Sequence, residues 1–182
     1  RAPTRSVSAS SPQPGATTEG GARVSLLLAN PFEADATVAV TLTTPDGALT
    51  PALLENVVVP GRSVHTVALN EHAPEQPDLG VVVEALAGRV VVEGVQALHP
   101  AIGGVEGRAL LAATPQPAAT WTVPRFVSDD GAKASWLWLT NPGDEVAVVE
   151  VVVHGPSGGT VPPGFDEVVL ENGRVVTSNF HD

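Results

Sequence analysis

The chain contains two segments that repeat one another at a constant separation. An Asn-Pro step at Asn30 opens a segment that ends at Gly47, and a second Asn-Pro step at Asn141 opens one that ends at Gly158. The separation is 111 residues both from Asn30 to Asn141 and from Gly47 to Gly158. A duplicated segment is expected to form the same supersecondary unit twice. The repeat therefore predicts two structural units of one design along the chain.

Short runs of alternating apolar and polar residues follow one another through residues 21–114. Val24, Leu26 and Leu28, for example, fall on one face of a single run. A period of two with one apolar face is typical of a half-buried antiparallel strand. Turn sequences such as Pro45-Asp46-Gly47 separate the runs, and no window shows helical periodicity. The predicted strands are Arg23–Asn30, Ala36–Thr43, Asn56–Val59, Ser63–Leu69, Gly80–Leu86, Arg89–Leu98 and Arg108–Ala113.

Seven short strands at this spacing indicate an all-β fold, with residues 21–114 forming an immunoglobulin-like β-sandwich. Residues 1–20 are rich in Ser, Thr, Pro and Gly, and we interpret them as a linker or a leading strand. The chain begins at Arg1 with no apolar signal segment, and we interpret it as a mature or excised fragment.

Residues 115–182 are predicted to repeat the beginning of this sandwich, with a one-residue slip near Gly173. The chain ends at Asp182, before counterparts of the last three strands of the first sandwich. We therefore expect tandem immunoglobulin-like β-sandwich domains, the second incomplete, either truncated or completed by another chain. The strands expected in this part are Trp121–Val123 as an added leading strand, Trp136–Thr140, Val148–His154, Glu167–Leu170 and Arg174–Phe180.

The composition limits the classes of partner. Lys and Arg number 9 against 20 Asp and Glu, which gives a net charge of −11. Such a surface repels phosphate backbones and anionic lipid, so we expect no nucleic-acid partner. No run of about 18 apolar residues occurs, so we expect no membrane insertion by this segment. The chain has no Cys, which excludes disulfides and thiolate metal sites.

Three tryptophans are the candidate binding residues: Trp136, Trp138 and Trp121. Trp136 and Trp138 lie two apart on a predicted strand, so they share a face opposite Leu137 and Leu139. Two coplanar rings on a sheet can stack against sugar rings or against an apolar protein partner. The alternative is that they bury against the loop around Trp121 or against the neighbouring unit, because large aromatics usually supply burial.

We predict no catalytic residue, no metal site and no cofactor. The histidines show no metal-ligand spacing, and we expect them on the solvated surface. A Ser–His–Asp triad meets only in space, but the Gly-x-Ser-x-Gly nucleophile elbow is absent. The acidic turns at 129–131 and 143–145 offer oxygen ligands for calcium without the spacing of an EF-hand. The histidines are His65, His72, His99, His154 and His181.

Several motifs together resemble one actinobacterial family. They are Leu-Leu-Leu-Ala-Asn-Pro, Trp-Leu-Trp-Leu-Thr-Asn-Pro, the following valine strand and Gly-bearing turn, the turn at 60–63 and the lead-in at 119–121. The family consists of secreted or membrane-anchored proteins of unknown function, built from tandem immunoglobulin-like sandwiches. The resemblance covers residues 20–182 and implies an extracytoplasmic location and a role in the cell envelope. It brings no catalytic residues.

We therefore expect a non-catalytic structural or interaction module, located outside the cytoplasm or in the cell envelope. Its expected partners are another protein, or a further copy joined through sheet edges, and a cell-wall glycan. Two alternatives remain: a carbohydrate-binding module that uses the tryptophan face, and a subunit of an extracellular fibre completed by strand exchange. These functions rest on analogy with a fold family rather than on a site.

Overall fold

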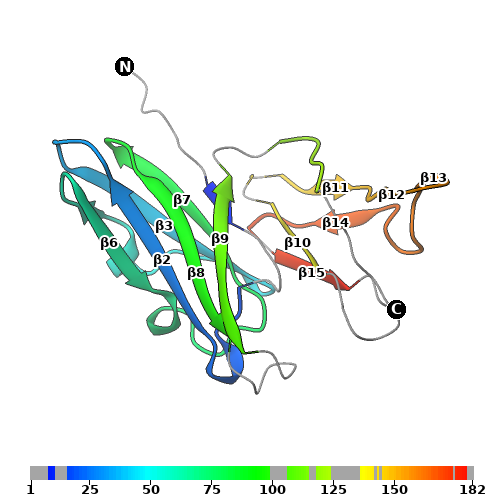
Figure 1. The fold of residues 1–182 in the computed structure, drawn as a ribbon, viewed down its shortest axis with the longest axis horizontal. Helices are drawn as coiled ribbons and strands as arrows, with labels where there is room; N and C mark the ends of the chain where they lie inside the picture. Colours follow the sequence, from blue (N-terminus) through cyan, green and yellow to red (C-terminus); the bar gives the residue numbers. More distant parts are fainter. Residues whose placement is uncertain are drawn as a thin grey trace.

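The computed structural model confirms an all-β fold (Figure 1). In the part of the chain that the structure describes, the only helices are three short 3₁₀ turns, at Glu19–Gly21, Ala52–Leu54 and Leu69–Glu71. None of the helices there is long and apolar enough to cross a bilayer. The described residues are 8–10, 16–98, 106–114, 118–123, 136–141, 143, 145–173 and 175–179.

The first unit, β1–β9, is one nine-stranded sheet with antiparallel pairing. Its order is β4-β3-β7-β1-β9-β8-β2-β6, with β5 also paired to β3. Figure 1 shows β6, β2, β8 and β9 side by side in this order. The strands are β1 (Ser8–Ser10), β2 (Arg23–Asn30), β3 (Ala36–Thr44), β4 (Gly47–Leu49), β5 (Val57–Val59), β6 (Ser63–Ala68), β7 (Gly80–Ala87), β8 (Val91–Leu98) and β9 (Gly107–Thr114).

The core of the first unit lies where the apolar faces of β2, β3 and β7 meet. Leu26 and Leu28 on β2, Val38 and Val40 on β3 and Val83 on β7 are all at most 1% exposed and belong to one cluster. The alternation predicted from the sequence is therefore visible as burial, because successive side chains of a strand point to opposite faces. Each fully buried Val or Leu contributes about 1.5–3 kcal/mol relative to an exposed one.

All seven strands predicted within residues 21–114 are present, with ends that differ by at most two residues. Two further strands were not in that set. β4 pairs with the end of β3 through a tight turn at Gly47, whose φ of 135° suits glycine. β1 comes from the 1–20 segment and lies between β7 and β9, so that Ser10 pairs with both Val81 and Ala113. β1 thereby joins the two halves of the sheet.

The second unit, β10–β15, consists of three two-stranded pairs: β10 with β15, β11 with β14 and β12 with β13. Figure 1 shows them to one side of the large sheet. The strands are β10 (Trp136–Thr140), β11 (Ala147–Val149), β12 (Val153–Gly155), β13 (Gly158–Thr160), β14 (Val168–Leu170) and β15 (Val175–Asn179).

Two strand predictions in this part are wrong. The predicted strand Val148–His154 is broken into β11 and β12, because no described strand pairs with residues 150–152 as β7 pairs with the counterpart β3. Residues 121–123 are not a strand, and the side chains of Trp121 and Val123 are 57% and 58% exposed. A single run without a partner has no ladder to join, so its apolar content alone does not make a strand.

The pairing registers of the second unit repeat those of the first with both strands shifted by 111 residues. The β10–β15 pair corresponds to β2–β6, the β11–β14 pair to β3–β5 and the β12–β13 pair to β3–β4. Ser25, for example, pairs with Ala68, and Trp136 pairs with Asn179.

The shift persists through β15, so the predicted one-residue slip near Gly173 is wrong. The backbone places Arg62, with φ of 55°, at the position that Gly173 occupies in the second unit with φ of 65°. Gly61 and Gly173 are 112 residues apart, so the two glycines are not at equivalent positions. Left-handed backbone conformation, rather than glycine itself, is what the two turns share.

Candidate functional site

A buried asparagine fixes the turn that follows the first repeated strand of each unit. In the first unit, Asn30 Nδ2 donates hydrogen bonds to the carbonyl oxygens of Ala34 at 2.8 Å and Val59 at 3.0 Å. Its Oδ1 accepts one from the backbone N–H of Phe32 at 3.0 Å. The side chain amide thus ties the turn to β5, and the residue is 2% exposed.

Asn141 makes the same three hydrogen bonds with residues shifted by 111. Its Nδ2 donates to the carbonyl oxygens of Glu145 at 2.7 Å and Leu170 at 3.0 Å, and its Oδ1 accepts from the N–H of Gly143 at 3.0 Å. An amide offers two donors and an acceptor, which a carboxylate or an alkyl side chain cannot replace. The repeated Asn-Pro motif therefore has a structural role.

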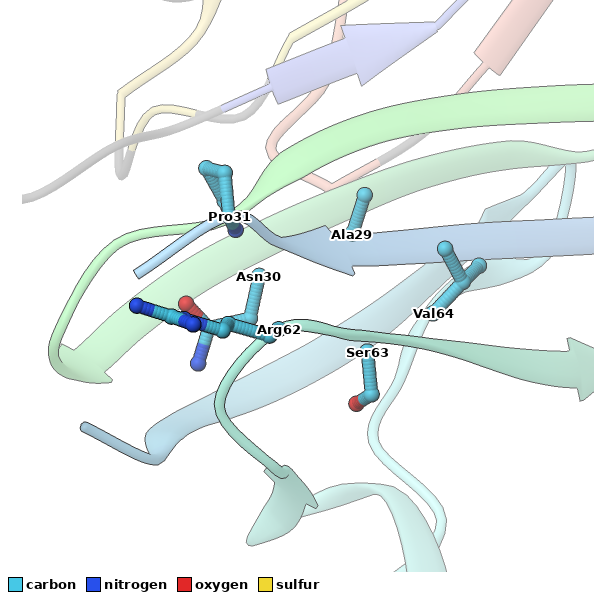
Figure 2. A pocket seen from close by; sticks show the side chains of 6 residues that line it. All are labelled: Ala29, Asn30, Pro31, Arg62, Ser63 and Val64. Atoms are coloured by element: carbon cyan, nitrogen blue, oxygen red, sulfur yellow. The ribbon is translucent and has the colours of Figure 1, made fainter. Parts of the chain in front are cut away.

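A shallow hollow of about 330 Å³ lies beside the Asn30 turn, where the end of β2 meets the start of β6 (Figure 2). Its polar groups already have partners: Ser63 Oγ donates to the carbonyl oxygen of Pro60 at 2.7 Å, and the Arg62 guanidinium pairs with Glu33. None of the lining residues is a His, Asp, Glu or Cys that could act as a general base beside a nucleophile. The lining residues are Ala29, Asn30, Pro31, Arg62, Ser63 and Val64.

Trp138 contacts the first unit. Its side chain is 9% exposed, and its indole Nε1 donates a hydrogen bond to Asp78 Oδ1 at 3.0 Å. Asp78 lies just before β7, so this bond joins β10 of the second unit to the large sheet. An indole N–H can only donate and an ionised carboxylate can only accept, so the two groups match. This is burial against the neighbouring unit, one of the arrangements expected from the sequence.

Two glycines allow the units to approach closely. A Cβ on Gly80 would lie 2.3 Å from Thr43 Oγ1 and 3.0 Å from Thr140 Oγ1, the latter from β10. A Cβ on Gly173 would lie 2.6 Å from the Cβ of Ala48 in the first unit. A side chain at either position would therefore require neighbouring groups to shift. The inter-unit junction is defined here by Ala48, Asp78 and Gly80 of the first unit and Trp138, Thr140 and Gly173 of the second.

The first unit does not carry the junction residues of the second. Positions 27, 29 and 62, which correspond to Trp138, Thr140 and Gly173, hold Leu, Ala and Arg. The side chain of Arg62 is 70% exposed, and a side chain at this position would obstruct the approach that Gly173 permits. The junction chemistry is therefore specific to the second unit.

The other two candidate tryptophans differ from Trp138. Trp121 is 57% exposed. The backbone of Trp136 lies in β10 opposite Asn179, and its side chain is outside the described residues. The structure therefore brings Trp138 to Asp78 and leaves Trp121 open to solvent. A shared aromatic face of Trp136 and Trp138 stays a prediction.

The remaining candidates do not form a site among the described residues. No group of three His, Cys, Asp or Glu there could hold a metal ion. His65 and His154 are exposed and His72 is half-buried, whereas His99 and His181 lie outside the described residues. The acidic turn 129–131 and Asp144 also lie outside them.

The structural roles of two polar residues, Asp78 and Gln96, were not predicted from the sequence. Asp78 lies in a polar loop. Nothing in the sequence indicates that its carboxylate accepts a hydrogen bond from an indole. Gln96 is 0% exposed on β8, and neither its Nε2 nor its Oε1 has a hydrogen-bond partner. Its signal was present: Gln96 is in phase with Val92 and Gly94, which face inward on the same strand.

Comparison with known proteins adds one match. The model of a family described as "Family of unknown function (DUF5719)" matches residues 8–182. No curated protein matches the chain, and no solved structure does.

Proposed function

The chain belongs to DUF5719, a family of unknown function, and from its own geometry we propose that it is a non-catalytic spacer and interaction module of the cell envelope. It is built from tandem immunoglobulin-like sandwich units, of which the second is incomplete within this chain. The inter-unit junction holds these units at a defined angle. Partners bind to the sheet faces and edges, outside the cytoplasm.

The observation that carries this proposal is the inter-unit junction. Units within one chain move relative to one another by default, and contacts between their facing surfaces restrict that motion. Here a buried indole donates to Asp78 across the junction, and Gly80 and Gly173 permit contact at distances that exclude a side chain. These contacts support a fixed relative placement of the two units, which is the property that a spacer needs.

Two further features support the proposal. The apolar core between β2, β3 and β7 has the layered arrangement of a sandwich. The location outside the cytoplasm follows from the resemblance of the strand and turn motifs to secreted or anchored actinobacterial proteins. It is tested by protease treatment of intact cells of the natural host. Protection of the chain until the cells are lysed would contradict it.

The spacer role is tested by a distance measurement between the units. The chain has no Cys, so two introduced cysteines carry the only spin labels. Glu55 and Asp166 are exposed positions related by the 111-residue shift, and they suit Glu55→Cys and Asp166→Cys. Pulsed electron–electron double resonance then measures the distance between the two labels. We expect one narrow distribution of that distance.

Trp138→Ala should broaden that distribution, because it removes the indole and its bond to Asp78. The matched control is Leu27→Ala at the corresponding position of the first unit, which lies away from the junction and should leave the distribution narrow. A broad distribution in the unaltered chain would contradict a spacer of fixed geometry.

A carbohydrate-binding role is the second candidate, and the exposure of Trp121 favours it. An exposed indole is a suitable surface for the face of a sugar ring. Soluble cell-wall glycans are titrated against the chain and against Trp121→Ala while tryptophan fluorescence is recorded. A change in the unaltered chain that Trp121→Ala abolishes supports sugar binding. Identical traces for both proteins would remove this candidate.

A further inference from the structure

The hollow of Figure 2 lies at the place in the first unit that corresponds to the inter-unit junction in the second. Two of its lining residues, Ala29 and Arg62, correspond through the 111-residue shift to Thr140 and Gly173. Both counterparts belong to the inter-unit junction. On the first unit this surface is open, since Val64 is 62% exposed and the side chain of Arg62 is 70% exposed. The surface that contacts a neighbouring unit at the junction is thus present a second time, on the first unit itself.

The element that meets this surface at the junction is also present twice. At the junction, Ala48 on β4 faces Gly173, and β4 follows β3 through a tight turn. The hairpin β12–β13 repeats this turn in the second unit, with Gly159 at the position of Ala48. Residues 158–160 of the hairpin are exposed. The second unit therefore presents to solvent a copy of the element that the first unit uses at the junction.

The two residues that would meet have exchanged sizes relative to the junction. At the junction, Ala48 faces Gly173, whereas Gly159 would face Arg62. A Cβ at position 173 would lie 2.6 Å from the Cβ of Ala48, but its next nearest atoms are the N and Cα of Ala48 at 3.4 and 3.5 Å, which are ordinary contact distances. Arg62 has φ of 55° against 65° for Gly173, so the two turns direct a Cβ alike. A glycine opposite Arg62 therefore gives its side chain the room that Ala48 would not.

We propose that the chain associates head to tail with further copies of itself, through docking of the hairpin β12–β13 of one copy into the hollow of the next. Figure 1 shows this hairpin at the end of the molecule away from the large sheet, whereas the end of β2 and the start of β6, which border the hollow, lie at the opposite end. Two different surfaces at opposite ends make a heterologous contact, which builds an open filament rather than a closed dimer. The inference rests on the proposed interaction role and names its partner, a second copy of this chain.

The first test is the solution mass of the full chain, measured by sedimentation velocity from micromolar to several hundred micromolar protein. Physiological salt is used because it screens the repulsion between copies that each carry a net charge of −11. The mean mass should rise with concentration without reaching a limit, and hydrogen exchange should slow at residues 62–64 and 158–160. A mass that stays at that of the monomer, or that stops at a dimer, would overturn the proposal.

A charge in the hollow tests the acceptor surface. Val64→Lys should weaken the association by at least about tenfold, because docking would bury an unpaired ammonium group. The matched control is Val58→Lys, which alters an equally accessible valine on β5 that does not line the hollow and should leave the association unchanged. Equal effects of the two substitutions would overturn the assignment of the hollow.

A double-mutant cycle tests the contact between the hairpin and the hollow. Gly159→Ala should weaken the association by about tenfold in the unaltered chain, but by less than about twofold in an Arg62→Gly chain, which restores the alanine–glycine pair of the junction. An added Cβ at Gly159 would also lie 3.0 Å from His154 Cε1 within its own hairpin. Equal weakening in both chains would show that only this local effect operates, and would overturn the contact.

A mixture of two disabled chains tests the head-to-tail arrangement. Val64→Lys chains retain an intact hairpin and Gly159→Ala chains retain an intact hollow, so an equimolar mixture should form a dimer and no larger species. Absence of this dimer would overturn the arrangement. The distance between labels at Glu55 and Asp166 is measured on the dilute monomer and tests the spacer role separately. A narrow distribution beside a constant monomer mass would overturn only the head-to-tail association, whereas a broad distribution counts against the spacer role.

Discussion

The two repeated asparagines allow one interaction to be measured twice in one molecule. Replacement of Asn30 by Ala removes three hydrogen bonds and leaves the carbonyl oxygen of Val59 without this donor in the core. A hydrogen bond contributes about 0.5–1.5 kcal/mol, so the loss of three is expected to cost about 2–4 kcal/mol. Asn141→Ala removes the corresponding three. Domains are typically stable by about 5–15 kcal/mol, so either change is severe.

Thermal unfolding separates the two variants because all three tryptophans lie in residues 121–138. Tryptophan fluorescence therefore reports the second unit and, through Trp138, its contact with the first, whereas far-ultraviolet circular dichroism reports both units. A loss of 1 kcal/mol lowers Tm by about 4–8 °C in a domain of this size, so each variant should lower Tm of its own unit by more than about 8 °C. Asn141→Ala should shift the fluorescence transition, whereas Asn30→Ala should mainly shift the circular dichroism transition.

The control is Asn56→Ala, which alters an exposed asparagine and should change Tm little. Asn30→Asp tests the donor role: the carboxylate still accepts from Phe32 but cannot donate to the two carbonyl oxygens. It should therefore destabilise at least as much as Asn30→Ala at pH 7. If Asn30→Ala shifts Tm no more than Asn56→Ala, the amide does not hold the turn and the reasoning fails.

Three further changes test other parts of the structure. Gln96→Leu should raise the free energy of unfolding, measured by urea denaturation, by about 1–3 kcal/mol, because it replaces a buried amide without hydrogen-bond partners. A loss of stability would show that the amide has a partner in solution. Trp138→Phe should lower stability by about 1–3 kcal/mol, since it leaves Asp78 without the indole donor; an unchanged unfolding midpoint would contradict the junction. Gly173→Ala should lower the fluorescence-detected Tm, because its φ is 65° and its Cβ would lie 2.6 Å from Ala48; Gly155→Ala, with open space around it, is the matched control and should have little effect on Tm.

The sequence was sufficient for the strands of the first unit and for the repeat itself. Alternation along β2 predicted which residues face the core, because a period of two is fixed by strand geometry. The repeat predicted a shared design, and the registers and asparagine contacts recur with the same 111-residue shift. These features depend on local pattern, which a single sequence carries.

The sequence did not predict the tertiary contacts of the second unit. The valine run from Val148 to Val153 has the pattern of one continuous strand, yet the strand is broken where its neighbour is lacking. Strand length there depends on pairing, which is a non-local property. The contact of Trp138 with Asp78 joins residues 60 positions apart, and a polar loop residue carries no signal of such a partner.

The two units together show that equal apolar patterns do not give equal burial. Leu28 and Leu139 follow the same motif and occupy equivalent strand positions, but Leu28 is 0% exposed and Leu139 is half-buried. Among the described strands, β2 is paired on both edges, with β6 and β8, whereas β10 is paired only with β15, so burial of the same motif depends on pairing as well as on residue pattern.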